Sequence, residues 1–273
     1  MVISYKNTGF LGLALLMLTA MACKKESNTD YSVLPVVQGY ITPAHNIEVK
    51  VSAQKALLDT NAYGVAITGL QLKVSDGTTS KSLTEDKSGH YVLNDLKFVK
   101  AGLTYTLEFS YNGLPVSAST TVPPKPSGIA VSDYTQVIPV MTFGTTPTEF
   151  VPVTLTWSNA AANNHIIAFE YTESIKQVMD SRFNRDTATN VEVNVAKLAT
   201  YDLNRMTFRY YGNYRVILKR VNVEYVNMLN HSSTGSTSAN LTNVPTNVIN
   251  GLGIFTAFQA DTLSNYLLVK SEL

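Results

Sequence analysis

Apolar and polar residues alternate along much of the chain between residues 34 and 122. Along residues 103–110, for example, the apolar positions are Leu103, Tyr105, Leu107 and Phe109. A period of two places successive side chains on opposite faces of an extended chain, so it predicts half-buried β-strands with these four apolar residues facing inward. The same pattern predicts strands at Leu34–Ile41, Ile47–Gln54, Leu70–Val74, Tyr91–Leu93 and Leu114–Val122.

Turn-forming residues separate these short strands. Asp76-Gly77 and Asn112-Gly113 are each typical of a hairpin turn, because glycine adopts positive φ angles at low cost. Short strands at this spacing predict an antiparallel Ig-like β-sandwich over residues 33–124. Pro123-Pro124 then ends any strand, since proline donates no backbone hydrogen bond, and we expect a domain boundary there.

The chain over residues 125–273 predicts a second sandwich. Val153, Leu155 and Trp157 alternate, a polar loop follows, and another strand opens at His165. This order of strand, tryptophan, loop and strand resembles the early strands of a fibronectin-III-like domain. We therefore expect an all-β fold of two sandwiches, with Trp157 in the second core.

An insertion at about residues 173–211 interrupts the second sandwich. Ile175, Val178 and Met179 recur at helical spacing, which indicates a short helix at the start of the insertion. After the insertion, residues 212–222 alternate as a strand, and Asn222 can cap a further helix.

The N-terminal residues have the pattern of an export signal. Residues 10–22 are apolar but too few for a spanning helix, which needs about 20. Lys6 precedes them, and Cys23 follows the small residues Ala20 and Ala22 directly. This order resembles the lipobox of bacterial lipoproteins, in which the chain is cut before the cysteine and the thiol is acylated. The alternatives are a plain secretory signal with an unrelated cysteine and a buried N-terminal helix.

On the lipobox interpretation, residues 1–22 are a signal peptide cleaved between Ala22 and Cys23. Residues 23–32 are polar and form a flexible tether. Two or more acyl chains on Cys23 would anchor the protein stably in the outer membrane. The charged residues after Cys23 loosely resemble a surface-export signal, so we expect the cell surface rather than the periplasmic side.

Composition excludes several classes of partner and site. The net charge is +1 and only 15% of residues are charged, so nucleic acid is not expected as a partner. Cys23 is the one cysteine, which excludes disulfides and thiolate metal sites in the mature domains. Fifteen tyrosines and ten phenylalanines against one tryptophan suit β-structure.

The histidines and serines do not form a recognisable catalytic or metal-binding motif. The histidines, which match no zinc-binding spacing, are His45, His90, His165 and His231. We expect His90 and His165 in turns or at the surface. Gly235-Ser236 lies in a Ser/Thr-rich loop rather than at a strand-to-helix elbow. We therefore expect a non-enzymatic protein with no catalytic residue, metal or cofactor beyond a covalent lipid on Cys23.

One group of residues interleaves aromatic rings with a cation and is a candidate binding surface. Its members are Arg209, Tyr210, Tyr211 and Tyr214. Tyrosine and arginine are enriched at binding hot spots. Strand alternation alone also explains half of such residues as ordinary sheet positions, so both interpretations stay open.

Several phrases in the sequence occur in a characteristic order over residues 23–260: PVVQGYI, VSDGTTSKSL, GHYVL, GLTYTLEFSYNGLPVSASTTVP, VTLTWSN, RVILKRVNVEYVNML and NVINGLGIFTAF. They resemble an uncharacterised family of Bacteroidota outer-membrane lipoproteins with two Ig-like halves, which carries a domain-of-unknown-function label. Its members are often encoded beside TonB-dependent receptors.

The resemblance implies an accessory role beside such a receptor in nutrient uptake, and it supplies no catalytic residue to carry over. Capture of a peptide or glycan by the insertion, or an adhesive structural role at the surface, are the alternatives.

Overall fold

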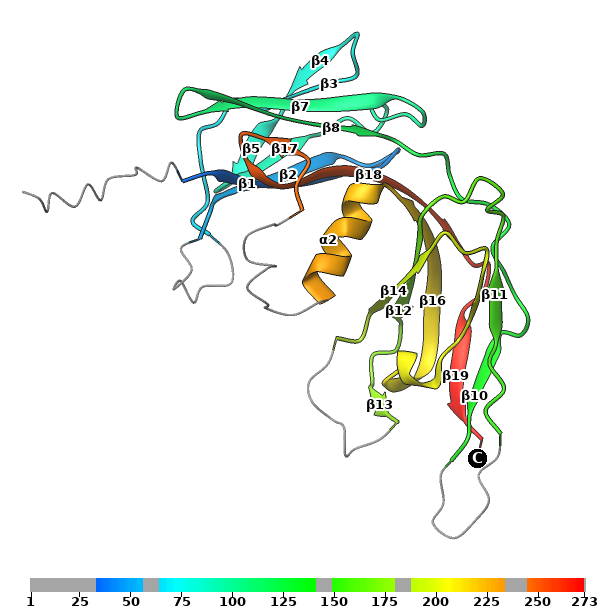
Figure 1. Ribbon diagram of the computed structural model, residues 1–273. Coiled ribbons are helices and arrows are strands. Elements are labelled where there is room, and N and C mark those ends of the chain that lie inside the picture. The colour runs from blue at the N-terminus through cyan, green and yellow to red at the C-terminus, as the bar shows by residue number, and fades with distance from the viewer. Residues whose placement is uncertain (1–32, 56–63, 141–148, 180–187, 234–244, 273) are drawn as a thin grey trace, which may run out of the picture. The chain divides into compact units, whose positions relative to one another are not determined.

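The computed structural model describes residues 33–55, 64–140, 149–179, 188–233 and 245–272. Within these ranges the fold is mainly β with one α-helix (Figure 1), which confirms the predicted all-β class. The strands of the first half are β1 (Pro35–Ile41), β2 (Ile47–Ala53), β3 (Lys73–Ser75), β4 (Ser80–Ser82), β5 (Thr84–Lys87), β6 (His90–Leu93), β7 (Thr104–Tyr111) and β8 (Leu114–Thr121).

The remaining elements follow the proline-rich connection. The strands are β9 (Ala130–Val131), β10 (Thr135–Ile138), β11 (Thr154–Thr156), β12 (His165–Tyr171), β13 (Gln177–Val178), β14 (Val191–Ala196), β15 (Thr200–Asp202), β16 (Tyr210–Val221), β17 (Val248–Ile249), β18 (Leu252–Thr262) and β19 (Leu267–Ser271). The helices are the 3-10 turn η2 (Arg205–Thr207) and the α-helix α2 (Val223–Ser233).

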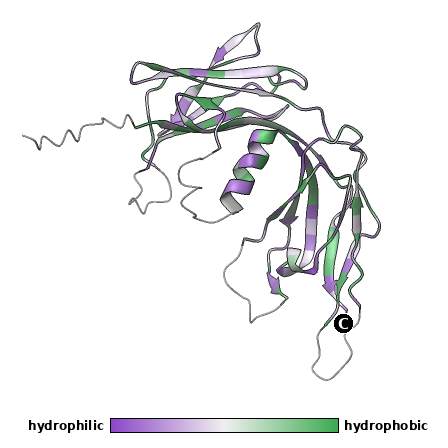
Figure 2. Cartoon of the chain, in the orientation of Figure 1, coloured by the Kyte–Doolittle hydropathy of each residue, from purple (hydrophilic) through white to green (hydrophobic). Residues whose placement is uncertain are grey.

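The first sandwich packs two sheets against each other. One sheet holds β1, β2, β6 and β5 in adjacent positions, and the other has the order β17-β8-β7-β3-β4. Apolar residues from both sheets meet between them, and Tyr91, Tyr105 and Leu107 are fully buried there. Figure 2 shows hydrophobic and hydrophilic residues alternating along these strands, as the sequence predicts.

The hairpin between β7 and β8 confirms the predicted turn. Tyr111 pairs with Leu114, and Asn112 and Gly113 have φ angles of 51° and 78°. The prediction that Leu103 is buried is wrong, since its side chain is 38% exposed. Leu103 lies before the first residue of β7, where the chain has not yet entered the core between the sheets.

Strand β18 belongs to both sandwiches. Its first residues pair in parallel with β1, from Val36 with Leu252 to Ile41 with Ala257. Its last residues pair with β16, and Phe255 and Ala257 complete the first core. The prediction of a first sandwich made from residues 33–124 did not include this return of the chain, and residues 34–273 form one compact unit.

The second sandwich places β12, β16, β19 and β10 of the large sheet against the small sheet β15-β11-β9. Leu155, Phe169 and Leu218 are fully buried between them. Trp157 is 6% exposed in the same cluster, so its predicted place in the second core is confirmed.

The start of the insertion is extended where a helix was predicted. Gln177 and Val178 form β13, which pairs with Tyr211 and Tyr210 of β16, and the amide of Met179 donates to the carbonyl of Arg209. Pairing with a distant strand therefore outweighs the local helical spacing, and the predicted helix is wrong for the described residues up to 179.

Helix α2 covers the face of the large sheet that points away from the second core. It begins directly after Asn222, the residue predicted to cap it. Val226 on the helix packs against Ile166 of β12 and Val221 of β16. Because one face of β12 meets the second core and the other meets the helix, the run from His165 to Phe169 is buried at every position.

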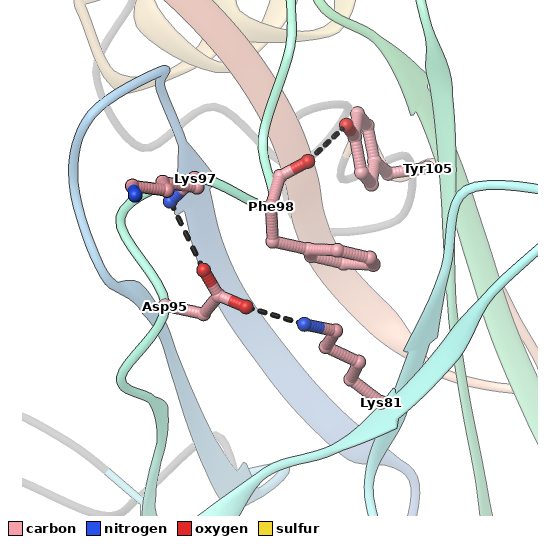
Figure 3. Close-up of polar contacts among 5 residues, drawn as sticks. All are labelled: Lys81, Asp95, Lys97, Phe98 and Tyr105. Atoms are coloured by element: carbon pink, nitrogen blue, oxygen red, sulfur yellow. Dashed lines mark hydrogen bonds and ion pairs between the residues drawn. The ribbon is translucent and has the colours of Figure 1, made fainter.

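A buried tyrosine fastens the loop that precedes β7 to the first core. The Tyr105 hydroxyl donates to the carbonyl of Phe98 at 2.8 Å and accepts from the amide of Lys100 at 2.9 Å. Figure 3 shows the same loop held by Asp95, which pairs with Lys81 and accepts from the amide of Lys97. The bond from the Lys81 ammonium, followed by the bond from the Lys97 amide, lowers the pKa of Asp95.

We expect Tyr105→Phe to lower the free energy of unfolding by about 1–3 kcal/mol, because it leaves a buried carbonyl and a partly buried amide without their partner. Chemical denaturation at neutral pH measures the change. Tyr134→Phe is the matched control, since Tyr134 is 38% exposed and should shift stability by less than about 0.5 kcal/mol. Equal effects of the two changes would contradict the role of the Tyr105 hydroxyl.

Candidate functional site

Two of the four residues in the predicted binding surface are buried in the core, and the other two are accessible to solvent. Tyr210 and Tyr214 are 4% and 1% exposed, so they are core residues, whereas Arg209 is exposed and Tyr211 is partly buried. The Tyr214 hydroxyl donates to the carbonyl of Tyr210 at 2.8 Å, and burial raises the pKa of Tyr214. Tyr210 and Tyr214 are therefore ordinary buried sheet residues. Arg209 and Tyr211 keep accessible surface and stay candidates for binding.

The buried tyrosines form part of an aromatic cluster. The ring of Tyr171 lies 5.5 Å from that of Tyr210 and 5.2 Å from that of Tyr214. Phe208 lies 4.9 Å from Tyr214 on the other side. Ring pairs at such distances stabilise a core beyond the area they bury. The cluster therefore stabilises the second core, and its buried rings are not presented to a ligand.

Histidine 165 is buried, so its predicted place in a turn or at the surface is wrong. Its side chain is 0% exposed, and its Nδ1 lies 3.0 Å from the carbonyl of Asn163, which therefore accepts a hydrogen bond from that nitrogen. Its Nε2 faces Arg220 Nε at 3.4 Å, and its ring centroid lies 5.9 Å from that of Trp157. Burial, and then the charge of Arg220, lower the pKa of His165 to about 4.

We expect the protein to lose stability as the pH falls from about 6.5 to about 4. In that window the unfolded chain binds a proton at His165 and the folded chain does not, so protonation stabilises the unfolded state relative to the folded state. The full loss is about 3 kcal/mol, at about 1.4 kcal/mol for each unit of pKa difference. Denaturant unfolding at a series of pH values measures it.

Two variants separate His165 from other titrating groups. His165→Gln keeps a donor and an acceptor and should flatten the pH dependence in this window. His45→Gln changes an exposed histidine and should leave the slope as it is. An unchanged slope in His165→Gln would show that another group carries the effect.

An open cleft of about 360 Å³ with several polar side chains lies where the end of β8 meets the start of α2, and we refer to it as the polar cleft. It is lined by Thr104, Ser119, Thr120, Thr121, Asn222, Val223 and Glu224. Hydroxyl, amide and carboxylate groups can bind a ligand rich in hydroxyls through hydrogen bonds, as sugars are bound. The sequence indicated Asn222 only as a helix cap, since residues about a hundred positions apart form this cleft.

Internal hydrogen bonds orient the polar groups of the cleft. Glu224 Oε1 accepts from the hydroxyls of Thr120 at 3.0 Å and Thr256 at 3.1 Å. The Asn222 amide donates to Thr120 Oγ1 and to the carbonyl of Thr121, each at 2.9 Å. These bonds join the start of the helix to the first sandwich, because Thr120 lies on β8 and Thr256 on the part of β18 that pairs with β1. Two hydroxyl groups therefore hold the Glu224 carboxylate in place, and neither of these donors is a cation.

The predicted lipidation site, with Ala22 and Cys23, lies outside the described residues. Within the described ranges, no group of three or more His, Cys, Asp or Glu side chains is placed to hold a metal ion. The described helices also include none that is long and apolar enough to cross a membrane.

Comparison with known proteins assigns the chain to a protein family. No curated protein matches the chain. Among solved structures, the FN1–FN3 domains of chicken CNTN1 align with 13% sequence identity and a TM-score of 0.28, over 70% of this chain and 61% of that one. The chain thus spans less than two thirds of the length of that structure. The model of the family described as domain of unknown function (DUF4249) matches residues 26–264, and the chain belongs to this family.

Proposed function

We propose that the protein is a non-enzymatic lipoprotein of a Bacteroidota outer membrane, anchored through Cys23. It would act as an accessory partner of a TonB-dependent receptor in nutrient uptake. One observation carries the proposal: an apolar run over residues 10–22 ends at Cys23, and a polar segment leads from there to the first strand at Pro35. That is the order of signal, acylation site, tether and folded unit.

The proposed mechanism is confinement of the protein to the membrane surface. Two or more acyl chains hold the protein in the plane of the membrane, which raises its effective concentration beside a membrane receptor. A weak contact then suffices for a lasting complex. In a sandwich, the groups available for such a contact are the loops at the ends and the open edges of the sheets.

Metabolic labelling with an alkyne palmitate tests the anchor. We expect the wild-type protein to carry the label and to sediment with outer membranes, and Cys23→Ser to lose both properties. Label that persists in Cys23→Ser would contradict acylation at this residue.

An affinity pull-down from detergent-solubilised outer membranes tests the partner. The acylated protein should bring down a TonB-dependent receptor, and an unrelated acylated lipoprotein of the same cells is the control. If the protein is acylated and no receptor is enriched over that control, the transport role is contradicted while the anchor stands.

A second candidate function is binding of a glycan in the polar cleft, which the held carboxylate of Glu224 favours. Calorimetry with a set of oligosaccharides tests it. Glu224→Gln should weaken binding about tenfold, because it removes one charge-assisted hydrogen bond of about 1.5 kcal/mol. Glu108→Gln changes an exposed carboxylate of β7 and should leave binding unchanged. No binding by any sugar would contradict this function.

A further inference from the structure

We propose that one end of the first sandwich rests on the lipid surface of the membrane. This anchor-side end is formed by the start of β1 at Leu34–Pro35 and by the segments beside it that carry Val65, Leu114 and Ile249. The inference rests on the proposed function, because it takes Cys23 as the membrane anchor. It adds a second, non-covalent contact with lipid and gives the first sandwich a fixed orientation on the membrane.

Backbone contacts place the three apolar residues around the start of β1. Pro35 pairs with Ala53, whose amide donates to the carbonyl of Val65 at 2.7 Å. On the other side, a Cβ added to Gly251 would lie 3.0 Å from the carbonyl oxygen of Pro35. The segment of Val65 and the turn that contains Gly251 therefore both adjoin the first residue of β1.

The hairpin of β7 and β8 reaches the same end. The Asn250 side chain donates to the carbonyl of Pro115 at 2.7 Å, and Ile249 pairs with Ser117. Leu114 is the first residue of β8 and directly follows the hairpin turn. Figure 1 shows this hairpin, β17 and the start of β1 at the same end of the first sandwich.

The side chains at this end have the chemistry of a lipid contact. Val65 is 79% exposed, Ile249 is 63% exposed and Leu114 is 47% exposed. Segments 34–35, 53–55, 64–66, 111–115 and 248–251 contain one charged residue, Lys55, and the β5–β6 turn that packs on Ala66 adds Asp86 and Lys87. The end would therefore meet lipid mainly through apolar side chains.

The length of the chain before β1 brings this end to the membrane. Eleven residue steps from Cys23 to Leu34 reach at most about 35–40 Å when fully extended. A flexible chain of that length has a mean end-to-end distance of about 15–20 Å. Lipid is thus within constant reach of the end at which the tether enters the sandwich.

Because Cys23 anchors the chain, a small apolar contact is enough to keep the end of the first sandwich on the bilayer. Three side chains bury too little area to hold a free protein on a bilayer, since interfacial binding scales with the buried apolar area. A short tether raises the local concentration of the patch at the lipid surface to the millimolar range. We therefore expect contact in the tethered protein and none in the free protein.

Site-specific fluorescence tests the contact without the native lipid. The mature chain, residues 23–273 with Cys23→Ser and an N-terminal hexahistidine tag, is bound to vesicles of phosphatidylethanolamine and phosphatidylglycerol that contain a nickel-chelating lipid. Since the chain then has no cysteine, Ile249→Cys takes a single environment-sensitive dye. Met206→Cys is the matched control, because Met206 is 64% exposed and lies in the second sandwich.

We expect nitroxide-labelled lipids to quench the dye at residue 249 at least about threefold more than the dye at residue 206. Equal quenching at the two positions would overturn the proposal. Val65→Ser with Leu114→Ser, in the chain labelled at residue 249, should lower the quenching toward the control level. Quenching unchanged by these substitutions would also overturn it, provided that thermal unfolding shows the variant to be folded.

Lack of lipid contact at the end of the sandwich and lack of acylation at Cys23 give different experimental results. The nickel lipid replaces the acyl chains, so equal quenching leaves acylation of Cys23 intact. Absence of palmitate on Cys23 in cells would remove the anchor itself, whatever the vesicles show.

Discussion

A fragment of residues 33–124 is expected not to fold by itself. In the full chain its core includes Phe255, Ala257 and Val248, which come from the other end of the sequence. Without them, β1 also loses its parallel neighbour β18, and β8 loses β17. Removal of one buried phenylalanine costs about 3–5 kcal/mol, and a whole domain is stable by only about 5–15 kcal/mol.

Circular dichroism and denaturant unfolding of the fragment measure this result. The control is the same fragment followed by a flexible linker and residues 245–258, which restores the missing strand segments and should unfold cooperatively. A cooperative transition in the fragment without the added segment would contradict the expectation. It would show that residues 33–124 are a domain of their own.

Gly253→Ala is expected to lower the free energy of unfolding by at least about 3 kcal/mol. Gly253 has a φ angle of 89°, and a Cβ there would lie 2.0 Å from the carbonyl oxygen of Val37. The left-handed conformation costs about 1–2 kcal/mol for a residue with a Cβ. The overlap with the Val37 backbone adds to it, because β1 would have to move away from β18.

Gly77→Ala separates the two contributions. Gly77 has nearly the same φ angle, 88°, but a Cβ there would meet nothing within 4 Å. It should show the conformational cost alone, about 1–2 kcal/mol. Chemical denaturation of both variants gives the difference. If Gly253→Ala is no more harmful than Gly77→Ala, the close approach of β18 to Val37 does not limit stability.

Local pattern was enough to predict most of the strands of the first half. The alternation in 47–54 and the pair Asn112-Gly113 determine short-range structure, because strand faces and hairpin turns depend on neighbouring residues. Leu103 departs from its pattern since it lies one residue before the strand begins. The large buried residue Trp157 was likewise predictable from size and alternation alone.

The features that sequence did not reveal depend on which distant segments meet. Burial of His165 results from its packing against Trp157 and Arg220, which are distant in the sequence, and no neighbour of His165 in the sequence indicates this. Alternation describes Tyr210 and Tyr214 equally well as surface or core residues until the opposite layer is known. The Glu224 cleft joins β8 to α2, so neither segment alone predicts it.

Strand β18 also has a consequence for the order in which the protein matures during synthesis. Residues 252–257 are made after all the strands from β1 to β16, yet they supply Phe255 and Ala257 to the first core. The first sandwich can therefore be completed only after most of the second sandwich has been made. Until β18 has been made, we expect the N-terminal half of the nascent chain to stay unfolded. A translocation channel for unfolded chains requires a substrate in this form.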